Sequence, residues 1–214
     1  GAIDIAEAGA TLYQARSGPE GRHFSEAERL LPSFERDFGS GLYDEGILRT
    51  LFLEFEDDQW LDEMHDFYRT DVPVPADLIV AGRTIRNVGV RYRGNSSFRS
   101  VPPELKRSID IEINHGDKDE RLLGYKTLNL LNAHDDPTFM REVLYSRIGR
   151  QYIPAFRGNF VKLVVNGESW GIYPNIQQYN NDFLEEWFGS RGGVRWKGRG
   201  SLTYEGTALE SYSG

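Results

Sequence analysis

The sequence predicts an α+β fold built on a largely antiparallel sheet with interspersed helices. Two observations support this class. Segments in which apolar and polar residues alternate come in pairs joined by tight turns, and such pairs are typical of hairpins. Stretches with helical spacing and polar starts separate these pairs, so the helices lie between antiparallel strands instead of connecting parallel ones.

The composition fits one folded domain and excludes several classes of protein. The chain has 214 residues, of which 39% are hydrophobic and 13% aromatic, and this is enough for a packed core. A net charge of −8 argues against a general nucleic-acid-binding protein, which needs a basic surface. The absence of cysteine excludes disulfides and thiolate zinc sites. No apolar run reaches the ~20 residues of a membrane-spanning helix.

Residues 1–40 differ in composition from the rest of the chain. They are rich in Gly, Glu, Ser and Arg and hold one short helical pattern, over 26–31. We expect an N-terminal extension or linker here, followed by one domain over 41–214. Near the start of that domain Leu51 and Leu53 recur with a period of two, which predicts a half-buried strand.

A helix and a hairpin are expected next. Helical spacing covers 57–68, with apolar residues on one side and a leading aspartate as the N-cap. Segments 76–80 and 86–93 flank Ala81-Gly82-Arg83 and are typical of a hairpin. Apolar residues and arginines alternate in its second strand, so the arginines share the face opposite the core.

Two strands and a helix follow a Pro-Pro loop. Segment 106–113 alternates isoleucine with polar residues, and 126–131 is a second expected strand. Asp136-Pro137 is expected to open a helix, because aspartate is a preferred cap and proline fits the first turn. The expected buried stripe of this helix comprises Met140, Val143, Leu144, Arg147 and Ile148.

The last elements carry the clearest turn signals. Asn166-Gly167 joins 160–165 to 169–173, and this dipeptide is a strong short hairpin signal. A helix over 182–188 is expected after that, capped by a preceding asparagine and ended by Gly189.

Basic residues at two strand ends are candidates for binding phosphate. Arg93 precedes the polar turn 94–97, which includes Asn95, and a planar guanidinium beside exposed N–H groups suits an anion. Lys106 and Arg107 begin the next strand on opposite faces, and kinases place a phosphate-binding lysine on a strand. The alternative interpretations are a surface turn beside a solvated arginine, and charged residues that merely flank an apolar strand.

Further polar residues lie near the expected ends of elements. Glu142 is a candidate partner for Lys106, because kinases pair a helix glutamate with the strand lysine. Its position opposite the expected stripe counts against this pairing. The amides of Gln177 and Gln178 suit the edge of a purine, or equally the backbone groups at an element boundary. Metal-binding spacings of the HExxH or EF-hand type are absent, so no metal site is assigned.

Several motifs occur in one order between residues 48 and 205. They are Arg93-Gly94-Asn95-Ser96-Ser97, Lys106-Arg107-Ser108, Gly124 through Leu130, Asp136-Pro137 with Arg141-Glu142, Asn166-Gly167-Glu168, Gln178 through Leu184, and Trp196-Lys197-Gly198. In this order they resemble the spore coat protein CotH kinase family, which comprises bacterial atypical protein kinases. The agreement of several independent motifs makes the resemblance specific.

The resemblance implies a protein-kinase-like fold and transfer of the γ-phosphoryl group of ATP, with Mg²⁺ or Mn²⁺, to a serine of a protein substrate. The nucleotide-binding residues that it implies are Arg93, Lys106, Arg107 and Gln178. The further candidates for an ion pair or for the pocket are Asn95, Glu142 and Gln177. Because such domains occur in secreted, extracytoplasmic and spore- or cell-surface proteins, a location of this kind is expected.

Two departures from the family pattern change these expectations. Gln177 stands where the family has a glutamate, so an ion pair there is lost or replaced by a neutral hydrogen bond. The family's acidic metal-binding and catalytic motifs lie further downstream than Gly214, so no catalytic residue is assigned in this chain. Residues 41–214 are therefore expected to form the nucleotide-binding part of the domain, with the catalytic part supplied by a missing C-terminal portion or a partner chain.

Two other functions remain open from the sequence. A non-catalytic structural or binding module could keep this scaffold within a spore-surface, cell-surface or extracellular assembly, and nucleotide affinity would separate it from a kinase. A hydrolase acting on glycans would need a pair of carboxylates, and no pair is marked by its sequence context.

Overall fold

The computed structural model describes residues 41–102, 105–193 and 195. The chain divides into two compact units, Gly1–Tyr179 and Asn180–Gly214, and each is described by itself. The expected extension over residues 1–40 and the motif Trp196-Lys197-Gly198 lie outside the described residues.

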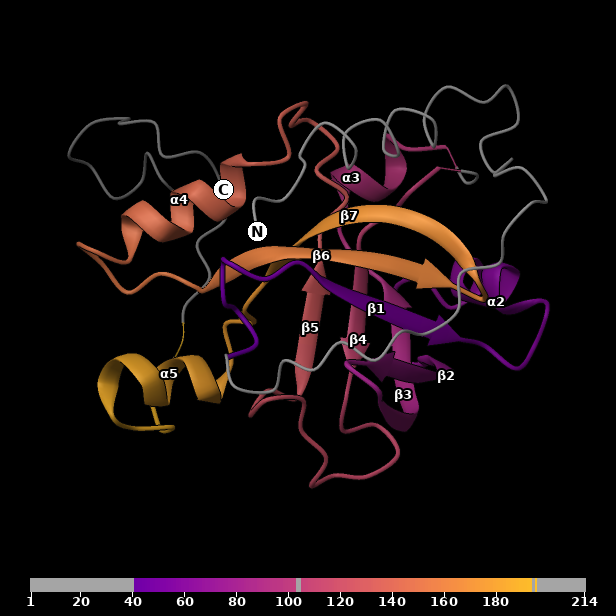
Figure 1. The fold of residues 1–214 in the computed structure, drawn as a ribbon, viewed down its shortest axis with the longest axis horizontal. Helices are drawn as coiled ribbons and strands as arrows, with labels where there is room; N and C mark the ends of the chain where they lie inside the picture. Colours follow the sequence, from indigo (N-terminus) through magenta and orange to yellow (C-terminus); the bar gives the residue numbers. More distant parts are fainter. Residues whose placement is uncertain (1–40, 103–104, 194, 196–214) are drawn as a thin grey trace, which may run out of the picture. The chain divides into compact units, whose positions relative to one another are not determined.

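The described part of the first unit is built on a closed barrel (Figure 1). Its strands are β1 (Arg49–Glu54), β2 (Val74–Val80), β3 (Arg83–Tyr92), β4 (Ile109–Glu112), β5 (Thr127–Leu130), β6 (Gly158–Val165) and β7 (Glu168–Ile176). They follow one another around the barrel in the order β1-β2-β3-β4-β5-β7-β6. Three short helices lie in the connections: α2 (Trp60–Asp66), α3 (Ser96–Arg99) and α4 (Arg141–Gly149).

The predicted α+β, protein-kinase-like fold with interspersed helices is wrong, because the sheet closes on itself and the helices are few. All neighbouring strands pair antiparallel except β1 and β6, which pair in parallel and close the barrel. This closing register joins Arg49 to Val161 and Leu53 to Val165. Local alternation predicts hairpins, but it carries no signal for a pairing between segments more than 100 residues apart.

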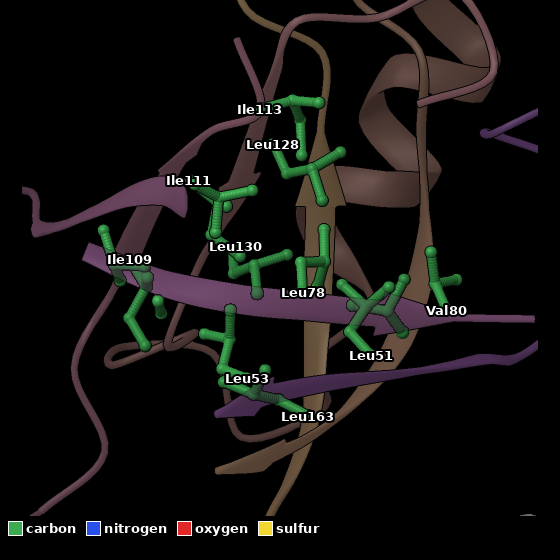
Figure 2. Packing of buried hydrophobic residues seen from close by; sticks show 14 of the residues in the cluster. Leu51, Leu53, Leu78, Val80, Ile109, Ile111, Ile113, Leu128, Leu130 and Leu163 are labelled. Carbon is green, nitrogen blue, oxygen red and sulfur yellow. The ribbon is translucent and has the colours of Figure 1, made fainter. Parts of the chain in front are cut away.

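The barrel interior is filled by the inward side chains of every strand (Figure 2). Residues of one parity on β4 and β5 share this core, as the alternation of strand side chains requires. They are Ile109, Ile111, Leu128 and Leu130, each at most 2% exposed. The predicted half-buried character of β1 is wrong at Phe52, which has the opposite parity to Leu51 and Leu53 and is also buried.

The two predicted hairpin turns are confirmed. Ala81 and Gly82 have φ values of 49° and 75°, and Asn166 and Gly167 have φ values of 47° and 84°. Positive φ at both central residues suits the right-handed twist of the flanking strands. The Asn166 side chain also accepts a hydrogen bond of 2.7 Å from the Phe55 N–H, so this turn is tied to the end of β1.

The helix predicted to open at Asp136-Pro137 begins five residues later, at Arg141. The Asp136 carboxylate instead closes a compact turn, in which it accepts hydrogen bonds from the N–H and hydroxyl of Thr138 and from the N–H of Arg141. Phe139 has φ 61° and interrupts any helix across this turn. Similarly, α2 begins at Trp60, and Asp57 accepts the Gln59 N–H in the turn that precedes it.

The predicted buried stripe of α4 is confirmed at Val143 but is wrong at Met140, Leu144 and Ile148, which are exposed. Val143 and Ser146 face the sheet, whereas Leu144 and Ile148 are 42% and 58% exposed. Gly158 of β6 explains this orientation, because a β-carbon there would stand 3.1 Å from the Ser146 Oγ. The helix crosses β6 so closely that a small residue must lie at the contact.

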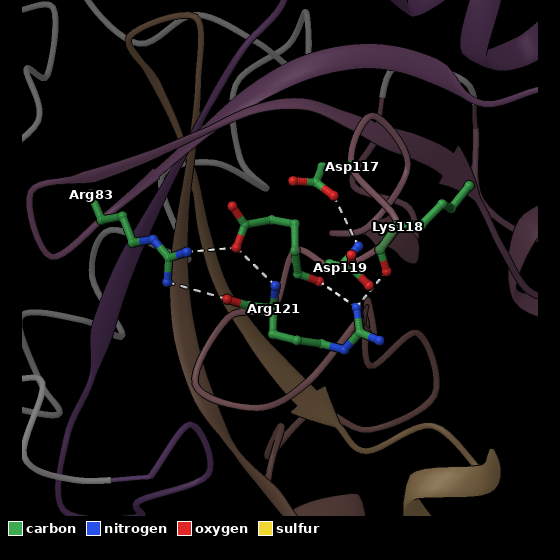
Figure 3. A network of polar contacts seen from close by, with 6 residues as sticks. Arg83, Asp117, Lys118, Asp119 and Arg121 are labelled. Carbon is green, nitrogen blue, oxygen red and sulfur yellow. Dashed lines mark hydrogen bonds and ion pairs between the residues drawn. The ribbon is translucent and has the colours of Figure 1, made fainter.

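A charged network holds the β4–β5 loop to the start of β3 (Figure 3). The Arg83 guanidinium donates to Glu120 Oε1 at 2.5 Å and to the Arg121 carbonyl at 3.2 Å. Arg121 in turn donates to the Lys118 carbonyl at 2.9 Å. These groups are partly exposed, so each contact contributes little to stability.

The described part of the second unit contains α5 (Asn181–Phe188). The Asn180 side chain caps it by accepting from the N–H groups of Asp182 and Phe183, and Gly189 ends it with φ 62°. The predicted helix, its asparagine cap and its glycine stop are therefore confirmed.

Candidate functional site

A row of polar side chains crosses the outer face of the barrel. The registers place Arg91 of β3 opposite Asp110 of β4, and Asp110 opposite Asn129 of β5. Their sequence neighbours, such as Ile111 and Leu128, belong to the core, so these three side chains point outward. Ile176 of β7 pairs with Asn129 and ends the row.

A second row runs beside the first, where the strands end. The Arg93 N–H donates to the Ser108 carbonyl at 3.0 Å, and the Leu131 N–H donates to the Pro174 carbonyl at 2.8 Å. Ser108 and Leu131 lie opposite each other, because they are the next pair beyond Ile109 and Leu130 in the β4–β5 register. Arg93, at the end of β3, is therefore the β3 member of a row that contains three pocket residues.

A pocket of about 320 Å³ opens over this second row. Its lining comes from five segments that are separate in the sequence: the 94–97 turn, the residue before β4, the 131–136 loop, the first turn of α4, and β7. The lining residues are Ser97, Ser108, Leu131, Asn132, Ala133, His134, Asp135, Asp136, Arg141, Glu142 and Pro174. The pocket thus gathers hydroxyl, amide, imidazole and charged groups on one side of the barrel.

Hydrogen bonds fix the floor of this pocket. The Ser108 hydroxyl donates to Asn132 Oδ1 at 3.0 Å and accepts from the Asn132 N–H at 3.0 Å. At the rim, burial alone would raise the pKa of Asp136. The hydrogen bonds from Thr138 and the Arg141 N–H outweigh it and hold the pKa below its usual range.

Arg93 is the cation with an unused donor at this site. Among the described residues, its buried Nη1 has no hydrogen-bond partner. Burial lowers the pKa of Arg93, and the charge of Asp110 partly opposes this effect. Asp110 forms its ion pair with Arg91 instead, at 3.0 Å. Burial raises the pKa of Asp110, and the two arginines partly offset the rise.

The two predicted glutamines occupy different environments. The Asn129 amide donates to Gln178 Oε1 at 2.9 Å and to the Ile176 carbonyl at 3.0 Å, so Gln178 joins the first polar row. Gln177 is buried, and its Oε1 accepts from the Arg157 N–H at 2.9 Å. Gln177 therefore completes backbone pairing beyond the end of β7.

Lys106 and Arg107 precede β4, which begins at Ile109, and neither residue lines the pocket. The Lys106 Nζ donates to the Ile172 carbonyl and lies over the rings of Tyr173 and Phe139, at 3.8 and 5.1 Å. The Arg107 guanidinium is buried over the Phe98 ring at 3.7 Å. The roles of both residues as phosphate contacts stay predictions.

The remaining candidates lie at the rim. Glu142 lines the pocket, and its pairing with Lys106 stays a prediction. The Asn95 side chain accepts a hydrogen bond of 2.6 Å from Arg69. The described ranges contain no group of three or more His, Cys, Asp or Glu side chains that could hold a metal ion.

Sequence reasoning missed two kinds of residue. Ser108 stands inside one motif and Asn132 lies just after another, but nothing local marks them as neighbours. Tyr68 and Arg69 follow α2 and contact the 94–97 turn, and no local spacing links them to a segment 26 residues away.

This arrangement is that of a barrel domain with a pocket lined largely by polar side chains. The chain belongs to the CotH family: the family model described as CotH kinase protein matches residues 90–208, which is more than half of the 214 residues. The resemblance drawn from the motifs is thereby confirmed over that segment, while β1, α2 and β2 precede it. A search of curated proteins found no match. No helix in the described ranges has the length and apolar character needed to cross a membrane.

Proposed function

We propose that this chain binds ATP on the outer face of β3, β4, β5 and β7, as the nucleotide-holding part of a protein serine kinase. The observation that carries the proposal is the buried Arg93 Nη1, which lacks a partner among the described residues and adjoins the pocket row. A guanidinium donor in a partly buried setting is a strong ligand for phosphate oxygens, because charge-assisted hydrogen bonds gain strength away from water.

The pocket chemistry supports a phosphate-bearing ligand. Ser97 offers a hydroxyl donor, and Arg141 offers a second guanidinium at the same pocket. Along the first polar row, the amides of Asn129 and Gln178 are already hydrogen-bonded to each other and so are held in place to contact the edge of a base. Lys106 and Arg107 remain proposed contacts of lower priority, since their cations face rings and carbonyls.

Bound ATP would supply the γ-phosphoryl group, which passes to a serine hydroxyl as the bond to ADP breaks and the hydroxyl proton is released. The chain's own part in this reaction is to hold and orient phosphates through Arg93, Arg141 and the Ser97 hydroxyl. The described residues present no cluster suited to Mg²⁺ or Mn²⁺, so no step here is assigned to a metal. We further propose an extracytoplasmic or spore-surface location, with a serine-containing protein as the substrate.

Calorimetric titration of ATP with Mg²⁺ into the whole chain tests the proposal. Arg93→Met should weaken binding about tenfold or more, because it removes a charge-assisted donor. Arg86→Met is the matched control, since Arg86 lies on the same strand with its side chain 84% exposed. If Arg93→Met binds like the wild type, phosphates do not lie at Arg93. If the wild type does not bind ATP, the proposal fails.

A non-catalytic binding module is the second candidate. Gln177 favours it, because the family's charged residue is replaced here by a neutral one whose Oε1 accepts a backbone N–H. Binding of a partner protein without measurable ATP affinity would support this alternative.

A further inference from the structure

We propose that Tyr68 and Arg69 are positioning residues that hold the 94–97 turn in the shape that presents Arg93 and Ser97 to the pocket. The inference rests on the proposed function. It concerns residues that precede the family-matched segment 90–208. The turn itself lies inside that segment and carries the Arg-Gly-Asn-Ser-Ser motif.

Two short hydrogen bonds join α2's C-terminal end to the turn. The Tyr68 hydroxyl donates to the Gly94 carbonyl at 2.6 Å, and Arg69 Nη2 donates to Asn95 Oδ1 at 2.6 Å. Gly94 and Asn95 are the two residues between Arg93 and the start of α3. Gly94 and Asn95 set the direction of the chain beyond Arg93, and each is held by a hydrogen bond from the segment after α2.

A stack of rings holds the far side of the same turn. The rings of Tyr68 and Phe98 are stacked with centroids 3.4 Å apart and planes 12° apart. The Arg107 guanidinium lies 3.7 Å from the centroid of Phe98. Two planar groups this close cannot share one face of a ring, so Phe98 lies between Tyr68 and Arg107. Arg107 also donates to the Val101 carbonyl at 2.9 Å, which fixes the segment after α3.

The conformation of Arg69 is consistent with a dedicated contact. Arg69 has φ 68°, a left-handed value that arginine seldom adopts. The residue is in the connection between α2 and β2, and its side chain reaches Asn95 while its guanidinium lies 5.6 Å from the Tyr68 ring. Tyr68 and Arg69 thus act on the turn as one unit.

Holding the turn in advance affects ligand binding. A free turn of small polar residues must lose conformational freedom when phosphate binds, whereas a turn already anchored loses less. The anchors should therefore tighten phosphate binding through Arg93 and Ser97, although Tyr68 and Arg69 are absent from the pocket lining.

The experiment compares Tyr68→Phe, Arg69→Met and Arg69→Lys with Arg86→Met in the whole chain. Tyr68→Phe removes the hydroxyl and keeps the ring stack, and methionine at position 69 keeps a long unbranched stem. Two quantities are measured for each variant: the affinity for ATP with Mg²⁺, and hydrogen exchange of the amides of residues 94–97. We expect binding to weaken about fivefold in Tyr68→Phe and about tenfold in Arg69→Met, with partial recovery in Arg69→Lys.

Amide exchange in the turn should accelerate in Tyr68→Phe and Arg69→Met, while exchange in β4 and the Arg86→Met control stay at wild-type values. If the wild type binds ATP and both variants keep its affinity, the inference is overturned and the proposed function stands. The same holds if amide exchange of residues 94–97 is unchanged in both variants. Absence of ATP binding by the wild type itself overturns the proposed function, and the positioning role fails with it.

Discussion

Gly94 and Ser97 approach each other so closely that a β-carbon on Gly94 would stand 2.3 Å from the Ser97 Oγ. Gly94 also has φ 91°, a conformation that favours glycine. Gly94→Ala should therefore destabilise the fold by about 2–3 kcal/mol, from backbone strain together with the clash. Urea denaturation of the variant measures this loss.

Gly124→Ala is the matched control for this substitution. Gly124 has the same φ of 91°, but no atom stands within 4 Å of an added β-carbon. It should lose only the strain component, about 1 kcal/mol. In the double variant Gly94→Ala/Ser97→Ala the clash is removed, so its loss should approach that of Gly124→Ala. Equal losses for Gly94→Ala and Gly124→Ala would contradict the close contact.

Asp136 should make the free energy of unfolding depend on pH in the acidic range. Its folded pKa lies below the usual value, so its contribution is present above the unfolded pKa near 3.9 and is lost as pH falls through the folded pKa. Asp136→Asn places an amide beside the Arg141 N–H, which the carboxylate now accepts at 2.8 Å. We expect a loss of about 1–2 kcal/mol at pH 7 that shrinks below about pH 4. A loss that stays constant from pH 7 to 3 would refute this assignment.

Local patterns in the sequence were sufficient for the hairpins but not for the barrel. The turns at Ala81-Gly82 and Asn166-Gly167 need positive φ, and the glycine in each turn predicts this conformation. Closure depends on β1 meeting β6, and the boundary of α4 depends on Phe139 taking φ 61°. Both are decided by tertiary packing, which a periodicity over a few residues cannot report.

The exposed apolar side of α4 gives a direct test of its corrected orientation. Leu144→Gln should change the free energy of unfolding by less than about 0.5 kcal/mol, because Leu144 is 42% exposed. Val143→Ala should cost about 1–2 kcal/mol, because Val143 is buried in a cluster with Phe156 and Ile176. Thermal or chemical denaturation compares the pair. A larger loss for Leu144→Gln than for Val143→Ala would restore the orientation that periodicity predicted.

Two substitutions of Asn129 test whether its hydrogen bonds or its packing stabilise the polar row. Its amide donates to the Ile176 carbonyl and to Gln178 Oε1, and both acceptors lack a negative charge. Asn129→Ala should cost about 2 kcal/mol. Asn129→Asp should cost more at pH 7, since it sets a carboxylate against two oxygens, and should recover as the pH falls and the carboxyl gains a proton. Equal stability of the two variants at pH 7 would show that these donors contribute little.

Single residues of the candidate site could be predicted from the sequence, but their grouping into one pocket could not. Arg93 stood out because a cation beside a small polar turn suits an anion. Arg107 was a candidate because it is a basic residue at the start of an expected strand. The structure places it against Phe98, which no spacing rule could indicate. Ser108 and Asn132 join the pocket only because the β4–β5 register continues past the strand ends.

The parallel pairing of β1 with β6 also determines how long nascent chains stay vulnerable on the ribosome. β1 ends at Glu54, but its partner strand is complete only at Val165. At typical rates of synthesis this interval lasts roughly 5–20 s. During it, the edge of β1 that will pair with β6 presents unpaired N–H and C=O groups that can recruit strands from other chains. A fragment cut to residues 90–208 would keep such edges permanently, so aggregation is the expected fate of the family-matched segment expressed alone.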